Sequence, residues 1–198
     1  MGIGVLDLQG AVREHVSALR ACGCSVRTVK RADDLDGLRG LVIPGGESTT
    51  IGKLMVDYGL MDAIRERAAL GMSIYGTCAG LVLLAREIQG SSQPRLGLMD
   101  MSVCRNAFGR QRESFESPLS IPVMGEEPFP GVFIRAPYVP EAGPACEVLC
   151  RYNGRIVLVR EGRFLASAFH PELTDDLRLH RYFLSMFDEE GRGRGDVE

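Results

Sequence analysis

A single cysteine stands between two glycines in the segment Gly76-Thr77-Cys78-Ala79-Gly80. An apolar run ending at Tyr75 precedes this segment, and a helix-like run from Leu81 to Ala85 follows it. The order is typical of a strand, a sharp turn and a helix, which together expose a nucleophile above an α/β sheet. Flanking glycines suit such a turn because strand and helix approach closely. A helix N-terminus also favours the thiolate, the nucleophilic form of cysteine. A free cysteine is commonly just a small buried hydrophobe, but the whole pattern favours a catalytic Cys78.

Strand-like and helix-like segments alternate over the first two-thirds of the chain. We expect strands at 3–8, 25–29 and 41–43, and helices at 11–21, 48–59 and 61–70, with Ser48 and Thr49 able to cap the second helix. This alternation predicts a mainly parallel central sheet with helices on both faces, an α/β fold in three layers.

The pattern changes after about Gly90. Short strand-like pieces separated by Pro and Gly follow from 98 to 140, and Asn153-Gly154 predicts a hairpin between 147–149 and 156–159. A last strand is expected at 164–169 and a closing helix at 175–187. We expect residues 1–189 to form a single domain and residues 190–198 to be a disordered C-terminal tail.

The overall composition narrows the function classes. A net charge of -3 and a pI near 5.7, with no basic stripe, argue against nucleic acid as a partner. No run approaches the roughly 18 apolar residues of a membrane span, and the first residues lack the pattern of a signal peptide. The six cysteines lack the paired spacing of a zinc site, and there are only three histidines. We therefore expect a cytoplasmic protein with reduced thiols and no bound metal.

A nucleophilic cysteine needs a base and usually a group that orients the base. His15 and His180 fall inside amphipathic segments, where structural roles are expected. His170 instead ends a predicted strand, in Phe169-His170-Pro171-Glu172. Residues two apart in extended chain point to the same side, so Glu172 can face His170 and set its tautomer. A surface turn would explain the same letters, but the presence of Cys78 favours a triad. Its order (nucleophile, histidine, acid) differs from that of α/β-hydrolases.

The segment Pro44-Gly45-Gly46-Glu47-Ser48-Thr49-Thr50 follows another predicted strand. Its two glycines allow backbone N–H groups to point at a ligand, as an oxyanion hole requires. The N–H of Ala79, the residue after Cys78, is the natural second donor. The segment lacks the ending of a P-loop, and a plain turn with a serine cap remains an alternative.

Six segments together resemble one protein family. They are LQGAVREH (8–15), PGGESTT (44–50), GTCAGL (76–81), RNAFGRQ (105–111), FIRAP (133–137) and ASAFHPELT (166–174). GTCAG with a later HPE is similar to class I, triad-type glutamine amidotransferases, which have a flavodoxin-like fold. The full set resembles the glutaminase subunits of pyridoxal 5'-phosphate synthase, over about residues 2 to 187.

The resemblance implies a mechanism. His170, oriented by Glu172, would deprotonate Cys78, and Cys78 would attack the side-chain amide of L-glutamine. Ammonia would leave, and water would hydrolyse the γ-glutamyl thioester to glutamate. The family's glutamine-binding positions fall on Gly46, Glu47, Ser48, Arg105, Ile134 and Arg135. The oxyanion would be held at Gly46 and Ala79, and no cofactor is implied.

The resemblance also implies a partner. Family members pass ammonia to a (β/α)8-barrel synthase subunit within a large hetero-oligomer and are nearly inactive until it docks. Gln9 is a candidate for that interface, and the Gly45-Gly46 peptide is a candidate switch. Tyr138 departs from the family, where histidine is common. A cysteine peptidase or other hydrolase on the same scaffold, or a regulatory subunit without activity, are the alternatives.

Overall fold

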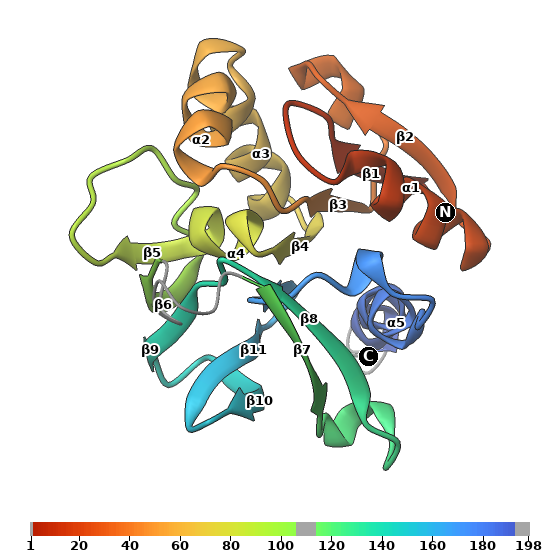
Figure 1. Cartoon of the computed structure of the whole chain (residues 1–198). Helices are drawn as coiled ribbons and strands as arrows, with labels where there is room; N and C mark the ends of the chain where they lie inside the picture. Colours follow the sequence, from red (N-terminus) through yellow and green to blue (C-terminus); the bar gives the residue numbers. More distant parts are fainter. Residues whose placement is uncertain (1, 106–113, 193–198) are drawn as a thin grey trace, which may run out of the picture.

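A computed structural model describes residues 2–105 and 114–192 of the chain (Figure 1). The strands are β1 (Gly2–Leu6), β2 (Ser25–Val29), β3 (Gly40–Ile43), β4 (Ser73–Thr77), β5 (Ala85–Ile88), β6 (Met99–Cys104), β7 (Ser114–Leu119), β8 (Phe129–Ile134), β9 (Tyr138–Ala142), β10 (Glu147–Tyr152), β11 (Arg155–Glu161) and β12 (Phe164–Ser167). The helices are α1 (Val12–Ala21), α2 (Ser48–Asp57), α3 (Leu60–Ala69), α4 (Ala79–Leu84) and α5 (Arg178–Arg192). Short 3₁₀ turns lie at η1 (Ala32–Leu35), η2 (Pro122–Met124) and η3 (Pro171–Leu173).

The central sheet has a parallel half and a largely antiparallel half. Strands β2, β1, β3, β4 and β12 lie side by side in that order, and every neighbouring pair among them is parallel. Strand β11 then runs antiparallel to β12, and β9, β6 and β5 extend the sheet. The α/β architecture with a mainly parallel central sheet is confirmed. Because the carboxyl ends of parallel strands meet at one edge, the parallel half brings its following loops together there.

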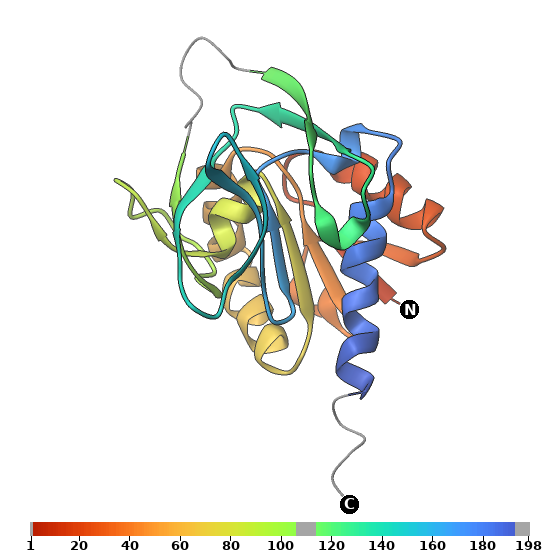
Figure 2. The same cartoon turned by 90° about the horizontal axis from the view of Figure 1, so that it is seen from below.

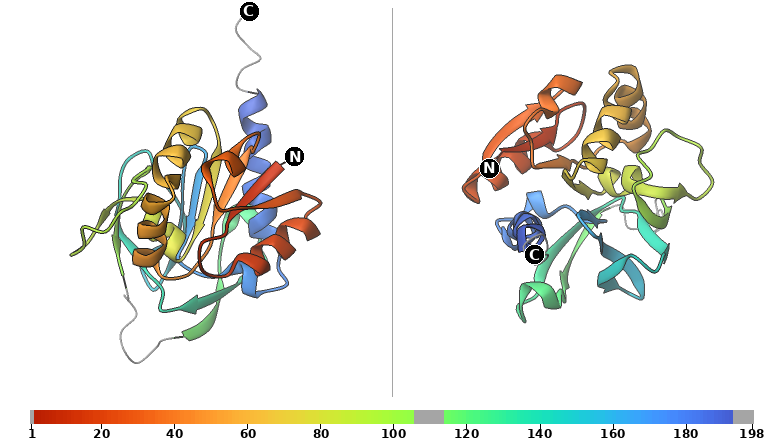
Figure 3. Two further views of the ribbon diagram at one scale, coloured as in Figure 1. Left: turned by 90° about the horizontal axis from the view of Figure 1, so that it is seen from above. Right: turned by 180° about the vertical axis from the view of Figure 1, so that it is seen from behind.

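Helices cover both faces of the parallel strands. Figure 3 shows α1 and α5 on one side of these strands and α2 and α3 on the other. Strand β3 is fully buried from Leu41 to Ile43, as expected for a strand covered on both faces. Helix α5 packs closely on this strand, and a Cβ at Gly40 would lie 2.6 Å from the ring of Phe187.

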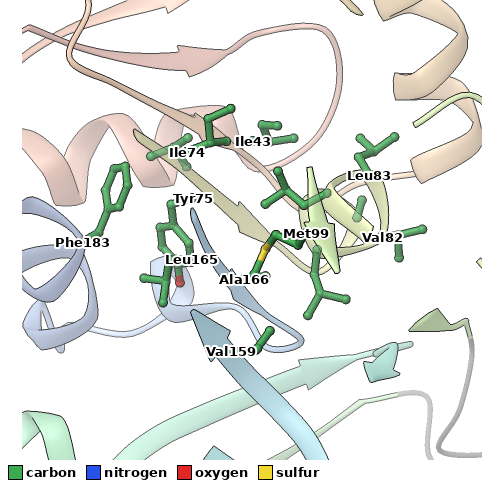
Figure 4. Packing of buried hydrophobic residues seen from close by; sticks show 14 of the residues in the cluster. Ile43, Ile74, Tyr75, Val82, Leu83, Met99, Val159, Leu165, Ala166 and Phe183 are labelled. Carbon is green, nitrogen blue, oxygen red and sulfur yellow. The ribbon is translucent and has the colours of Figure 1, made fainter. Parts of the chain in front are cut away.

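The core beneath the site combines apolar side chains from strands and helices. Tyr75 of β4 and Phe183 of α5 lie beside each other with ring centroids 5.5 Å apart (Figure 4). Strands β7 and β8 form a separate antiparallel ribbon that extends beside the main sheet (Figure 2).

Several predicted segments have different boundaries or roles. Strand β12 ends at Ser167 rather than at Phe169, and β5 begins at Ala85, where a helix was expected to end. Ser48 and Thr49 do not cap α2: Glu47 is the N-cap and makes no side-chain capping bond. The two hydroxyl groups instead donate hydrogen bonds to the side-chain oxygen of Gln93.

Two predicted features fall partly outside the described residues. Helix α5 continues to Arg192, so it includes the first three residues of the tail predicted from 190. Residues 193–198 of that tail lie outside the described part of the chain, as do residues 106–111 of RNAFGRQ.

The predicted hairpin at Asn153-Gly154 is confirmed, because β10 and β11 pair on either side of it.

Candidate active site

Cys78 occupies the sharp turn between β4 and α4, as the glycine pattern predicts. Its φ of 49° lies in the left-handed region, which is strained for a residue with a Cβ. Its N–H donates to the carbonyl of Ser167 at 2.8 Å, which ties the turn to β12. A Cβ at Gly76 would overlap the backbone of Gly80, and a Cβ at Gly80 would overlap the carbonyl of Ile43. Both glycines are therefore required by the close approach of strand and helix.

His170 and Glu172 follow β12 and lie beside this turn. His170 donates its backbone N–H to Val132 of β8 at 2.8 Å. The ring Nδ1 of His170 lies 2.8 Å from Glu172 Oε1, and both side chains are buried. The loop after β3 packs against both His170 and Cys78. A Cβ at Gly45 would lie 2.9 Å from this Nδ1 and 3.4 Å from the Cβ of Cys78. The structure thus brings Cys78, His170 and Glu172 together.

The electrostatics of the group favour a charged His170. Burial lowers the pKa of His170, but its hydrogen bonds to Cys78 and Glu172 and their negative charges outweigh burial and raise it to about 10. Burial raises the pKa of Glu172, but the nearby His15 and His170 outweigh this effect and lower it. At neutral pH the arrangement therefore favours an imidazolium beside an ionised carboxylate.

A pocket of about 400 Å³ opens onto Cys78 and His170. It is lined by all the predicted oxyanion and substrate positions, namely Gly46, Glu47, Ser48, Ala79, Arg105, Ile134 and Arg135. The charged residues comprise one carboxylate and two guanidinium groups, a combination that suits an amino-acid zwitterion. Like Cys78, Arg135 has a left-handed φ, of 42°.

Gln93 contacts several residues of this pocket and was not predicted from the sequence. Its Oε1 accepts hydrogen bonds from Arg105 Nη1 at 2.8 Å, Thr49 Oγ1 at 3.1 Å and Ser48 Oγ at 3.4 Å. Gln93 belongs to the loop before β6, and its local sequence carries no signal of this role.

His15 and His180 also lie closer to the site than expected. His15 Nε2 lies 3.4 Å from Glu172 Oε2 and 3.1 Å from Thr77 Oγ1. Its Nδ1 lies 3.1 Å from His180 Nε2, and both rings are fully buried. The position of His15 within LQGAVREH was the only sequence signal for this contact.

Two further residues named from the sequence have clear contacts. Gln9 Oε1 accepts a hydrogen bond from the N–H of Glu47 at 2.7 Å, so it touches the predicted oxyanion loop. Tyr138 packs under the guanidinium of Arg155, whose carbon lies 4.7 Å from the ring centroid.

The described residues contain no metal-binding cluster, disulfide or membrane-spanning helix. Within residues 2–105 and 114–192, no group of three or more His, Cys, Asp or Glu side chains is arranged to hold a metal ion. All six cysteines, which lie in this part of the chain, are free thiols. None of the helices described is both long and apolar enough to cross a membrane.

Comparisons with known proteins show which family the chain resembles. Residues 5–189 match the model of the SNO glutamine amidotransferase family. The chain is 61% identical over 184 residues to a protein of Pelotomaculum thermopropionicum named pyridoxal 5'-phosphate synthase subunit PdxT, covering 93% of this chain and 94% of that one. It is 59% identical to the PdxT protein of Geobacillus kaustophilus, covering 96% of each.

Solved structures also resemble the fold. One, described as a glutamine amidotransferase, has a TM-score of 0.90 and 52% identity, covering 94% of this chain and 98% of that one. PurLQS from Thermotoga maritima has a TM-score of 0.66 at 18% identity, covering 93% and 97%, and supports the fold alone.

Proposed function

This chain belongs to the SNO glutamine amidotransferase family, and we propose that it is the glutaminase subunit of a pyridoxal 5'-phosphate synthase. The proposal is carried by Cys78 and His170, which line a pocket together with every predicted substrate position, and by Glu172, which contacts His170 from behind. Relatives named as PdxT subunits, which match over nearly their whole length, support the same assignment.

The reaction begins with the Cys78 thiolate. Its sulfur attacks the side-chain amide carbon of L-glutamine, while the thiol proton resides on His170. The charged intermediate oxygen is stabilised by the N–H groups of Gly46 and Ala79. The intermediate expels ammonia, which takes the proton from His170, and a γ-glutamyl thioester remains on Cys78.

Hydrolysis of the thioester completes the cycle. Neutral His170 accepts a proton from water, and the resulting hydroxide attacks the thioester carbon. The intermediate expels the Cys78 sulfur as a thiolate and forms the γ-carboxylic acid, which loses its proton to solvent as glutamate leaves. His170 is again an imidazolium. Glu172 keeps the Nδ1–H of His170 directed at itself, so that Nε2 serves the reacting atoms.

Binding of glutamine would use the charges around the pocket. A guanidinium from Arg105 or Arg135 suits the substrate carboxylate, and Glu47 suits its ammonium group. Gln93 holds the Arg105 side chain at the N-terminus of α2. Arg105, Thr49 and Ser48 thus share one acceptor.

The product requires a second protein. Ammonia is mostly protonated in neutral water and is then no nucleophile, so a synthase must receive it before it equilibrates. We expect a (β/α)8-barrel synthase subunit, docked in a hetero-oligomer, to take ammonia directly and to activate this site. Gln9 is exposed and contacts the N–H of Glu47, so it connects the protein surface with the oxyanion loop.

The test is glutamate release from L-glutamine, measured with and without the synthase subunit. We expect partner-dependent activity in the wild type and none in Cys78→Ala. Cys22→Ala, which changes a half-buried free thiol at the end of α1, should retain it. Absence of activity with the partner would overturn the proposal and favour a regulatory subunit. Peptide hydrolysis without the partner would instead favour a peptidase.

A further inference from the structure

All three histidines of the chain lie around Glu172. His170 contacts one carboxylate oxygen, Oε1, at 2.8 Å. His15, from α1, faces the other oxygen, Oε2, at 3.4 Å, and His180, from α5, lies 3.1 Å behind His15. The mechanism uses only the first of these contacts.

The second carboxylate oxygen has little else to stabilise it. Among the described residues, Glu172 Oε2 accepts no hydrogen bond of good geometry. The 3.4 Å distance to His15 Nε2 is that of a close electrostatic contact, and Thr77 Oγ1 shares the same nitrogen at 3.1 Å. An ionised carboxylate is an acceptor only, so a bare ring nitrogen facing it would be repelled. His15 therefore carries its proton on Nε2.

The protonation of His180 follows from that of His15. Burial lowers the pKa of His15, and burial together with His15 lowers the pKa of His180 to about 3, so both rings are neutral at pH 7. A neutral His15 with its proton on Nε2 has a bare Nδ1, which can only accept. His180 must then donate from Nε2, leaving its Nδ1 bare. This agrees with the structure, because His180 Nδ1 has no hydrogen-bond partner among the described residues. The opposite tautomers would bury an N–H without an acceptor.

We propose that His15 is a positioning residue for the glutaminase reaction, holding Glu172 in place through a neutral N–H whose direction is set by His180. This inference rests on the proposed function, since Glu172 acts through His170. A neutral donor suits this place because a cation there would repel the His170 imidazolium, and the charge of His170 indeed lowers the pKa of His15. His180 donates to His15, the Nε2–H of His15 faces Glu172 Oε2 at 3.4 Å, and His170 donates to Glu172 Oε1.

The groups around His15 determine what a titration would report. Glu172 and His170 face it from the loop after β12, and His180 faces it from α5. Thr77 contacts it from β4, and Glu14 lies next to it on α1. The charges of Glu172 and Glu14 raise the pKa of His15, but burial outweighs them.

The first test reads the tautomers directly and needs no activity. With ¹⁵N-labelled histidine, NMR of the folded chain at pH 7 should give two kinds of side-chain pattern from the three rings. We expect His15 and His180 as neutral rings protonated on Nε2, with His170 as the one ring carrying a proton on Nδ1. His15 protonated on Nδ1, or His180 protonated on Nδ1, would overturn the inference.

The second test separates positioning from mere structure, using the complex with the synthase subunit. We expect His15→Leu to lower kcat about tenfold to a hundredfold, while KM changes less than about threefold. The size of the effect is taken by analogy from residues that orient the metal-binding side chains of metalloenzymes. His15→Gln, whose amide can donate to Glu172 and accept from His180, should recover most of the loss. Tyr75→Phe is the matched control, because its hydroxyl bonds Ser167 and not these histidines.

The pH profile supplies a readout that a loss of stability would not move. Without the His15 N–H, the Glu172 carboxylate is less stabilised, so the acidic limb of kcat/KM should move to higher pH in His15→Leu but not in Tyr75→Phe. Equal losses in His15→Leu and His15→Gln, or an unshifted limb, would overturn the inference. An inactive wild-type complex would overturn the proposed function, and NMR would still decide the tautomers.

Discussion

Glu172 Oε1 lies 2.8 Å from His170 Nδ1 although these two residues are joined by a turn and not by extended chain. Strand β12 ends at Ser167, and η3 begins at Pro171, between the two residues. The N–H of Thr174 donates to the carbonyl of Pro171 at 3.2 Å and closes the turn. The predicted contact is therefore confirmed, but the expected reason for it, alternation along a strand, is wrong.

Glu172→Gln tests the orienting contact. The neutral amide cannot stabilise the His170 imidazolium and can present an N–H to Nδ1, which favours the wrong tautomer. We expect kcat for glutamine hydrolysis to fall by at least about a hundredfold, since a comparable change in a Ser-His-Asp triad costs about 10⁴. Glu14→Gln, an exposed carboxylate on α1, should stay within about twofold. Similar activity in both variants would contradict the role of Glu172.

Gly45→Ala tests the packing of the loop after β3 on His170. The added Cβ would overlap Cε1 of His170, so the ring or the loop must shift. We expect kcat to fall by about tenfold or more, because small misplacements of catalytic groups are costly. The control is Gly2→Ala, where the new Cβ would meet atoms only at 3.5 Å and beyond. Wild-type kinetics in Gly45→Ala would show that the loop and ring are not in contact during catalysis.

Stability should depend on pH through His180. Its pKa is lowered by burial and by His15 to about 3 in the folded chain, against about 6.5 when unfolded. Between these values the unfolded chain binds a proton that the folded chain excludes, so stability falls as the pH drops from about 6.5 towards 3. At pH 5 the loss from this group is about 2 kcal/mol relative to pH 7.

Urea unfolding at pH 7 and pH 5 measures this dependence. His180→Phe lacks this titrating ring, so it should lose less stability over the same interval than the wild type. The carboxylates titrate in both chains, so their contributions cancel in the comparison. Parallel losses in the two chains would contradict a neutral, buried His180.

Gln93→Leu tests the support of the substrate pocket. The variant removes the acceptor that lies 2.8 Å from Arg105 Nη1 and also bonds Thr49. Since Arg105 is exposed, we expect a modest effect, a rise of about threefold to tenfold in KM for glutamine with kcat nearly unchanged. Gln89→Leu, an exposed glutamine just after β5, is the control. A fall in kcat without a change in KM would mean that Gln93 acts on the chemistry and not on binding.

A short sequence pattern was sufficient to predict a structural feature that lies within a single segment of the chain. Gly76 and Gly80 predicted the turn at Cys78, because only glycine permits that approach of strand and helix. Asn153-Gly154 predicted its hairpin for a similar reason, and the family resemblance is confirmed by the match over residues 5–189. Such features depend on backbone geometry within a few residues.

The surroundings of the triad were decided by tertiary structure. His15 and His180 are 165 residues apart and meet only because α1 and α5 cover the same face of the sheet (Figure 3). Gln93 reaches Ser48 across 45 residues from an irregular loop. The amino-acid sequence by itself was enough to predict the fold class and the group of Cys78, His170 and Glu172 that the structure brings together. Folding decided which buried polar groups contact Glu172 and Arg105, because those contacts are set by how distant elements pack and not by any local pattern.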